Sequence, residues 1–121
     1  LPLIYTIYRR FIMDANSVLV NALNSYIYDI SSDYKGDCTA LLKQVETCRD
    51  YANNNEITVG WIKSHYMIIL PAIKSYRKFL KFLIEDADRN KDEDKLAELR
   101  AENNILWSYS ALLKPYQKFI P

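Results

Sequence analysis

TVGWIKSHYMIILPAIKSYRKFLKFLIE, residues 58–85, is the stretch that decides the fold. Its apolar side chains recur at alternating steps of four and three residues, which is the spacing of one face of an α-helix. The members of this seam are Ile62, Tyr66, Ile69, Ile73, Tyr76, Leu80 and Leu83. Because the seam keeps its phase through Pro71, we predict one helix from Thr58 to Glu85, kinked near residues 67–71. Two helices that meet at Leu70 are the alternative, since the residue before a proline avoids the helical conformation.

Amphipathic patterns on either side of this stretch predict three more helices. The first runs from about residue 3 to residue 30. The second has Asp37 or Thr39 as its N-cap and ends at 53–55, and the last runs from near Asp92 to Lys114. The apolar stripe of the first consists of Ile4, Tyr8, Phe11, Ala15, Val18, Ala22 and Tyr26. The inward residues of the second are Leu41, Leu42, Val45 and Cys48. Those of the last are Leu99, Leu106, Tyr109 and Leu113. We expect a turn over 31–37, and an all-α, antiparallel up-and-down bundle of about four helices in a single domain, 1–121.

The composition excludes several chemistries. The chain has two glycines, and it contains neither a Gly-rich dinucleotide-binding motif nor a phosphate-binding P-loop. Its one histidine, His65, together with Cys38 and Cys48 supplies three metal ligands at most, without the paired spacing of a zinc site. We therefore expect no cofactor, no metal and no catalytic residue. A small enzyme or a phosphorelay protein that uses His65 is the third of three functional hypotheses.

The two cysteines and the longest apolar run bear on the cellular setting. On a continuous helix the Cα atoms of Cys38 and Cys48 would lie about 15 Å apart, whereas a disulfide spans about 7 Å at most. We therefore expect reduced thiols, which favours a reducing, intracellular compartment. The longest apolar run, 66–73, is far shorter than the roughly 20 residues that cross a bilayer, so no transmembrane segment is expected.

An acid-rich segment follows the decisive stretch: nine of the eleven residues in 85–95 are charged. Its oxygen-bearing side chains stand at alternate positions, as in a calcium-binding loop, and are Asp86, Asp88, Asn90, Asp92 and Asp94. The EF-hand pattern requires glycine where Lys91 stands and a bidentate glutamate where Ala97 stands. A solvated loop between two helices is therefore expected.

A basic stripe lies on one side of the decisive stretch and consists of Lys63, Lys74, Arg77, Lys78 and Lys81, of which the last four are the candidate anion-binding residues. No acidic residue occurs between Ile57 and Ile84, so the stripe is a candidate anion-binding surface. It defines the alternative hypothesis, a helical nucleic-acid-binding domain that tracks phosphates. The net charge of +1 does not favour it.

The aromatic content supplies the leading hypothesis. Ten tyrosines, two tryptophans and four phenylalanines exceed what a compact core requires, and exposed aromatic residues are common anchors of protein interfaces. The candidate partner-binding residues are Trp61, Phe79, Trp107 and Tyr116. We expect a non-enzymatic module that presents an aromatic-rich helix face or groove to a protein partner or to a second copy. The excess of Ile, Asn, Lys and Tyr over Gly, Ala, Pro and Arg (42 against 21 residues) indicates an AT-rich genome, as in many pathogens and viruses, and hence a host-interaction factor.

Overall fold

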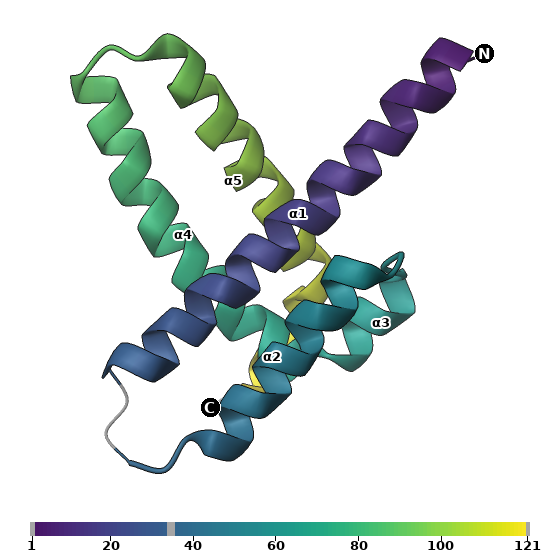
Figure 1. Ribbon diagram of the computed structural model, residues 1–121, viewed down its shortest axis with the longest axis vertical. Coiled ribbons are helices and arrows are strands. Elements are labelled where there is room, and N and C mark those ends of the chain that lie inside the picture. Colours follow the sequence, from purple (N-terminus) through teal and green to yellow (C-terminus); the bar gives the residue numbers. More distant parts are fainter. Residues whose placement is uncertain (1, 34–35, 121) are drawn as a thin grey trace.

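The computed structural model describes the backbone of residues 2–33 and 36–120, and the side chains of residues 16–32 and 36–120. Within these ranges every regular element is a helix, so the predicted all-α bundle is confirmed (Figure 1). The elements in chain order are α1 (Pro2–Asp33), α2 (Thr39–Asn54), α3 (Val59–Ser64), α4 (Tyr66–Arg89), α5 (Glu93–Leu113) and the 3-10 helix η1 (Lys114–Phe119).

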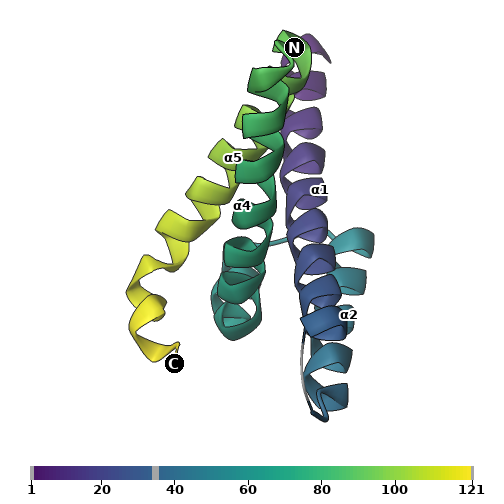
Figure 2. The same cartoon turned by 90° about the vertical axis from the view of Figure 1, so that its left-hand side faces the viewer.

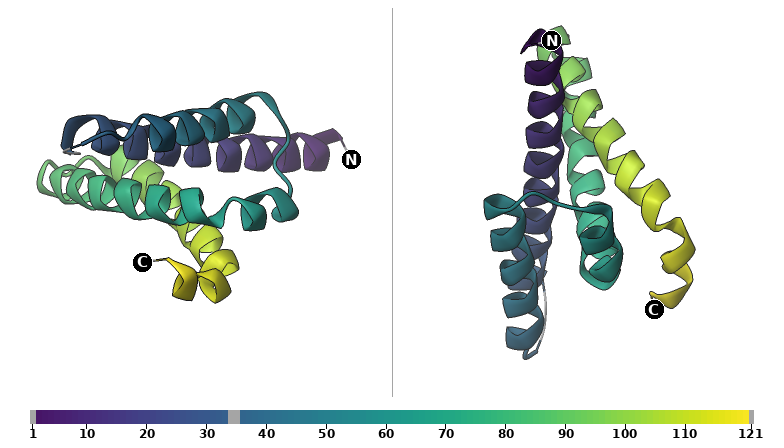
Figure 3. Two further views of the ribbon diagram at one scale, coloured as in Figure 1. Left: turned by 90° about the horizontal axis from the view of Figure 1, so that it is seen from below. Right: turned by 90° about the vertical axis from the view of Figure 1, so that its right-hand side faces the viewer.

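The four long helices are stacked in the order α2, α1, α4, α5. In the right panel of Figure 3, α2 and α4 lie on opposite sides of α1, and α5 lies beyond α4. α1 packs extensively against both α2 and α4, whereas α2 and α4 contact each other little. In Figure 2, α5 lies close to α4 at their shared turn and diverges from it towards η1. The α4–α5 hairpin therefore opens towards the C-terminus.

The core joins all four long helices. Its fully buried large side chains are Leu19, Leu23, Val45, Ile69, Leu80, Leu106 and Leu113. The predicted seam is buried at five of its seven positions and partly buried at Tyr66 and Leu83. Each such aliphatic side chain stabilises the fold by about 1.5–3 kcal/mol, and this supports helices whose intrinsic propensity alone would be insufficient.

The stripe predicted for the first helix is confirmed where its side chains are described. Val18 and Ala22 are buried and Tyr26 packs partly buried against the core. Its other members, Ile4, Tyr8, Phe11 and Ala15, lie outside the described side chains. The helix is longer than predicted and reaches Asp33, so the predicted turn over 31–37 is shorter, and residues 34 and 35 of it lie outside the description.

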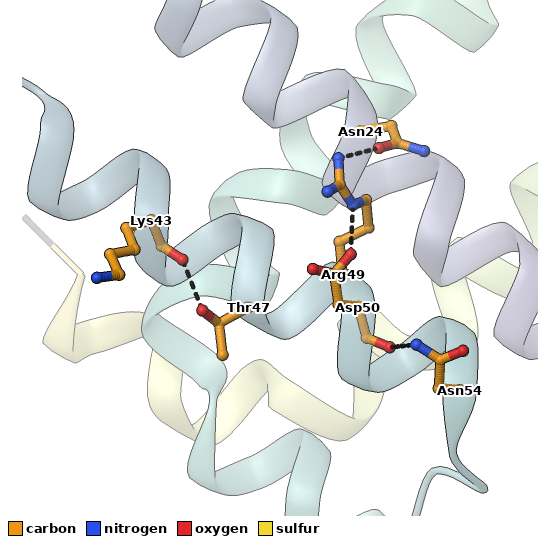
Figure 4. A network of polar contacts seen from close by, with 6 residues as sticks. All are labelled: Asn24, Lys43, Thr47, Arg49, Asp50 and Asn54. Atoms are coloured by element: carbon orange, nitrogen blue, oxygen red, sulfur yellow. Dashed lines mark hydrogen bonds and ion pairs between the residues drawn. The ribbon is translucent and has the colours of Figure 1, made fainter.

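α2 is anchored at its start and along its contact with α1. The Asp37 carboxylate accepts a hydrogen bond from the Thr39 backbone N–H at 3.1 Å, and this bond lowers the pKa of Asp37. Further along, Arg49 Nη1 donates to Asn24 Oδ1 on α1 at 3.3 Å, and Arg49 Nε lies 3.1 Å from Asp50 Oδ1 (Figure 4). The Arg49 charge is therefore compensated within the protein.

The interruption of the third predicted helix lies at His65, not near 67–71 or at Leu70, which corrects the sequence prediction. The His65 backbone N–H donates to the carbonyls of Trp61 and Ile62, and the His65 carbonyl accepts from Ile68 and Ile69 N–H. His65 thus ends α3 and begins α4, and its Nδ1 lies 2.8 Å from the Trp61 carbonyl oxygen. The groups freed by the break are satisfied locally.

Pro71 is accommodated inside α4, in its second turn. A proline there removes the hydrogen bond to the carbonyl four residues earlier, that of Met67. Met67 is an exposed residue, so solvent can satisfy this carbonyl. The helix can therefore continue through the proline without a break at that position.

The connection between α4 and α5 is much shorter than the loop predicted for the acid-rich segment. α4 extends to Arg89 and α5 begins at Glu93, which leaves three connecting residues. Asp92 N–H donates to Ala87 O at 3.0 Å and Lys91 N–H donates to Asp88 O at 3.2 Å, the two bonds of a Schellman motif. Lys91 occupies the left-handed position, with φ 54°, where glycine is usual.

Candidate functional site

A groove of about 1200 Å³ runs between α4 and α5. Its apolar lining comprises Leu70, Pro71, Ile73, Ile84, Trp107 and Ile120. Its polar lining comprises Lys74, Arg77, Lys78, Lys81, Glu85, Asn103, Ser110 and Gln117. Four residues of the predicted basic stripe, Lys74, Arg77, Lys78 and Lys81, therefore share one groove with one of the predicted aromatic residues, Trp107. The fifth, Lys63, belongs to α3 and does not line the groove.

The α4 wall of the groove is strongly basic. Lys74, Lys78 and Lys81 are exposed, and their spacing of four and three residues places them along about 10 Å of one helix face. Among the described side chains, ion pairs join Arg49 to Asp50 and Arg89 to Asp86, and none involves this wall. Lys74, Lys78 and Lys81 therefore form no ion pair with a described side chain, although Glu85, four residues after Lys81, is an acidic member of the same wall.

The α5 wall is neutral and carries the one aromatic side chain of the groove. Trp107 is 53% exposed, and the Arg77 guanidinium carbon lies 4.0 Å from the centre of its ring. This cation–π contact joins the two walls and covers one face of the indole. Asn103 and Ser110 stand one turn away from Trp107 on either side and add uncharged hydrogen-bonding groups.

The C-terminal segment forms the end of the groove. The Tyr116 ring in η1 stacks on Tyr66 at 5.0 Å between centroids, and Phe119 lies 6.3 Å from the same ring. These contacts hold η1 against the start of α4. Gln117 and Ile120 therefore line the groove although they follow Leu113, the last residue of α5.

A polar junction beside the groove ties α1, α4 and α5 together. The buried Tyr76 hydroxyl donates to Glu102 Oε1 at 2.9 Å, and Asn21 Nδ2 donates to the same oxygen at 3.1 Å. Burial and the adjacent Glu102 carboxylate raise the pKa of Tyr76 well above its ordinary value. The neutral phenol thus stays a hydrogen-bond donor, which keeps the walls of the groove in register.

The structure separates the four predicted aromatic residues. Phe79 is 53% exposed but does not line the groove. Trp61 is only half-buried and stacks between the rings of Tyr51 at 5.0 Å and His65 at 4.4 Å. Tyr116 is held by its stack on Tyr66. Only Trp107 is brought together with Lys74, Arg77, Lys78 and Lys81.

His65 and Cys48 line a second, shallow pocket of about 580 Å³. Burial raises the pKa of the Cys48 thiol, which favours the neutral form over the nucleophilic thiolate. His65 is engaged through Nδ1 with the Trp61 carbonyl and through its ring face with the Trp61 indole. Cys38 and Cys48 are both free thiols.

Two searches of the described residues concern metals and membranes. No three His, Cys, Asp or Glu side chains within the described part are grouped closely enough to hold a metal ion. Asp86 and Asp88 belong to the last turns of α4 rather than to a loop. In the same part of the chain, no helix combines the length and the apolar character that crossing a bilayer requires.

The sequence did not single out Asn103, Ser110, Gln117 and Ile120, although they complete the groove. A signal for the α5 wall was present, because Asn103, Trp107 and Ser110 stand at steps of four and three and thus share one helix face. Gln117 and Ile120 had no comparable signal, since their position depends on the fold of η1 against α4.

In class, this protein is a small helical bundle, and the groove between its α4 and α5 helices is basic on one wall and neutral on the other. No protein-family model, no curated protein and no solved structure matches the chain. Its function is therefore inferred from the geometry and charge of the groove.

Proposed function

We propose that this protein is a non-enzymatic interaction module that binds a protein partner in the groove between α4 and α5. The observation that carries the proposal is the clustering of basic side chains and the half-exposed Trp107 around one apolar lining. Aromatic and arginine side chains in a partly desolvated depression are the usual centre of binding energy in protein interfaces.

The apolar lining favours a protein over a nucleic acid. A single strand binds by stacking successive bases on exposed aromatic faces, while cations track the phosphates. The groove offers one aromatic residue, Trp107, and the Arg77 guanidinium already covers one of its faces. The remaining apolar lining is aliphatic, which suits the side chains of a peptide better than bases.

A matched pair of variants tests the proposal, because Trp107 and Phe79 are equally exposed and only Trp107 lines the groove. Peptides are selected from a displayed random library on the immobilised full chain, and their affinities are measured by fluorescence anisotropy. Trp107→Ala should weaken the selected peptides about 10-fold or more, which corresponds to about 1.4 kcal/mol, whereas Phe79→Ala should change them about twofold at most.

Three results would contradict the proposal. One is that no peptide is enriched on the wild-type chain. Another is that both variants weaken binding of the selected peptides equally, which would show that the groove is not the binding site. The third is that a labelled 20-nucleotide single strand binds in a salt-dependent manner while peptides do not, which would support the nucleic-acid alternative.

A further inference from the structure

We infer that the groove binds an acidic amphipathic helix of the partner, which lies along α4 with its carboxylates towards Lys74, Lys78 and Lys81. This inference rests on the proposed function and specifies the chemistry of the partner. The charge of the groove and the arrangement of its two walls carry it.

The length of the groove suits a helix of about four turns. Its α4 wall extends from Leu70 to Glu85, fifteen residues along α4, or about 22 Å at 1.5 Å per residue. A partner helix of about 15 residues matches that length. Its apolar residues, spaced at i, i+3 or i+4 and i+7, would cover Leu70, Ile84 and the exposed part of Trp107, since all three are accessible in the groove.

The two walls require different flanks on the partner helix. The cations of Lys74, Lys78 and Lys81 follow about two turns of α4, so carboxylates at i, i+4 and i+7 on one flank can each approach one of them. The facing wall offers Asn103 and Ser110, which are uncharged. The other flank of the partner helix is therefore polar and neutral. Carboxylates on that flank would face the uncharged α5 wall and would add less to the affinity than carboxylates that face α4.

Glu85 gives the groove a charge gradient along its length. It lines the groove one turn beyond Lys81, at the end nearest the α4–α5 turn. A carboxylate of the partner is attracted beside Lys74 and repelled beside Glu85. The acids of the partner helix are therefore confined to the part that faces residues 74–81, and a cation opposite Glu85 fits the other end.

A second copy of this chain is a poorer occupant. Its acid-rich segment, residues 85–95, has the required negative charge, but the apolar residue of that segment, Ala87, is buried in its own core. Asp86 is also paired with Arg89 at 3.5 Å. This segment therefore brings no apolar side chain to cover the aliphatic lining of the groove.

Synthetic peptides test the charge requirement directly. Three fluorescein-labelled 15-residue peptides share one apolar stripe: one carries three glutamates on one flank, one carries glutamines instead, and one carries three lysines. With the full-length chain in 50 mM salt, the glutamate peptide should bind about 10-fold or more tightly than the glutamine peptide, and this advantage should shrink in 500 mM salt. In a W61F background, Trp107 is the sole tryptophan, and its emission should change on binding.

Charge reversal on the protein is the reciprocal test. Replacing Lys74, Lys78 and Lys81 by glutamate should abolish the preference for the glutamate peptide and create one for the lysine peptide. The matched control replaces Lys43, Lys95 and Arg100, which are exposed and outside the groove, and has the same net charge. It should retain the wild-type preference within about twofold, because screening weakens the effect of distant charges. Circular dichroism confirms that both variants are folded.

The results distinguish failure of the proposed protein-binding function from failure of the inferred acidic partner. If no peptide of any composition changes the anisotropy or the Trp107 emission, the proposed function fails and this inference fails with it. If peptides bind but the glutamine or lysine version binds as tightly as the glutamate version, only this inference fails. Two other results would also overturn this inference. Concentration-dependent dimerisation that is lost in the charge-reversal variant would favour a second copy as the occupant. Displacement of the glutamate peptide by a single-stranded nucleic acid would favour the nucleic acid.

Discussion

The two flanks of α4 differ in how their polar side chains are satisfied. On the flank that faces α1, Ser75 Oγ lies 2.8 Å from Ser25 Oγ and also donates to the Asp29 carboxylate. On the flank that faces α5, Lys74, Lys78 and Lys81 make no ion pair with any described side chain. One flank fixes the position of α4 against α1, whereas the charged groups of the other remain exposed.

The physical reason for this difference is the cost of desolvation. A polar group between packed helices loses water and is destabilising unless it finds a partner, and Ser75 finds two. An exposed ammonium group keeps its hydration and requires no partner for folding. Substitutions on the α1 flank should therefore change stability, and substitutions on the α5 flank should change binding.

The largest change in stability is expected in the core of the bundle, beneath the two flanks of α4. Leu80 is fully buried, so Leu80→Ala removes packing and leaves a cavity, at a cost of about 2–5 kcal/mol in the free energy of unfolding. Trp107→Ala, in the exposed wall of the groove, should cost about 1 kcal/mol or less. Urea unfolding followed by circular dichroism measures both, and equal losses would mean that Trp107 is part of the core.

A pair of substitutions on α4 tests the comparison itself. Ser75→Ala removes two inter-helix hydrogen bonds and should cost about 1–2 kcal/mol, because Ser25 and Asp29 lose a partner. Lys78→Ala, which changes an exposed side chain that lines the groove, should change stability by no more than about 0.5 kcal/mol. If the two variants had the same unfolding midpoint in urea, the polar contact with α1 would not help to hold α4.

The α4–α5 turn offers a smaller, stabilising change. Lys91 has φ 54°, a conformation that costs a side-chain-bearing residue about 1–2 kcal/mol, while glycine adds about 0.5–1 kcal/mol of unfolded-state entropy. Lys91→Gly should therefore raise the free energy of unfolding by about 0.5–1 kcal/mol without altering peptide affinity. Lys95→Gly, inside α5, is the control and should destabilise the protein instead.

A test on the side of α5 depends on pH. Burial raises the pKa of Tyr109 to about 12, whereas an unfolded tyrosine has a pKa of about 10. Below pH 10 both states keep the phenol proton, so Tyr109 adds no pH dependence. Between pH 10 and 12 the unfolded state loses this proton while the folded state retains it, and stability falls.

Urea unfolding of the wild type and Tyr109→Phe between pH 9 and 11.5 isolates this contribution, because all other titrating groups are common to both proteins. The wild type should lose stability with rising pH more steeply than the variant. If the free energies of unfolding of the two proteins differ by the same amount from pH 9 to 11.5, the packing of α5 does not bury the Tyr109 phenol.

The helices were predictable from residue spacing because the repeat of an α-helix is a local property. The last predicted helix, from near Asp92 to Lys114, agrees with α5 within one residue at each end, and the predicted end of the second at 53–55 includes the observed end at Asn54. The N-cap of α2 is Cys38, however, and not Asp37 or Thr39. The break at His65 was not predictable in this way. It depends on hydrogen bonds of one residue with Trp61, Ile62, Ile68 and Ile69, while the apolar spacing continues across it. Proline, the obvious signal, marked the wrong position.

The candidate site was predictable only in parts. The basic stripe could be read from the sequence, since Lys74, Arg77, Lys78 and Lys81 belong to one helix. Trp107 is 26 residues further along the chain than Lys81, and nothing in its neighbours showed that it would face the stripe. Trp61 and Tyr116 had the same aromatic signal, yet stacking on Tyr51, His65 and Tyr66 occupies their rings.

The sequence by itself determined the helical class, the buried seam and the basic face of α4, because each follows from the 3.6-residue period within one segment. Only the tertiary structure decided which flank of α4 faces α1 and which faces α5, and that η1 folds back to form the end of the groove. The physical reason is that packing one helix on another depends on side chains from both, so the basic stripe forms one wall of a groove only because α5 and η1 supply the others.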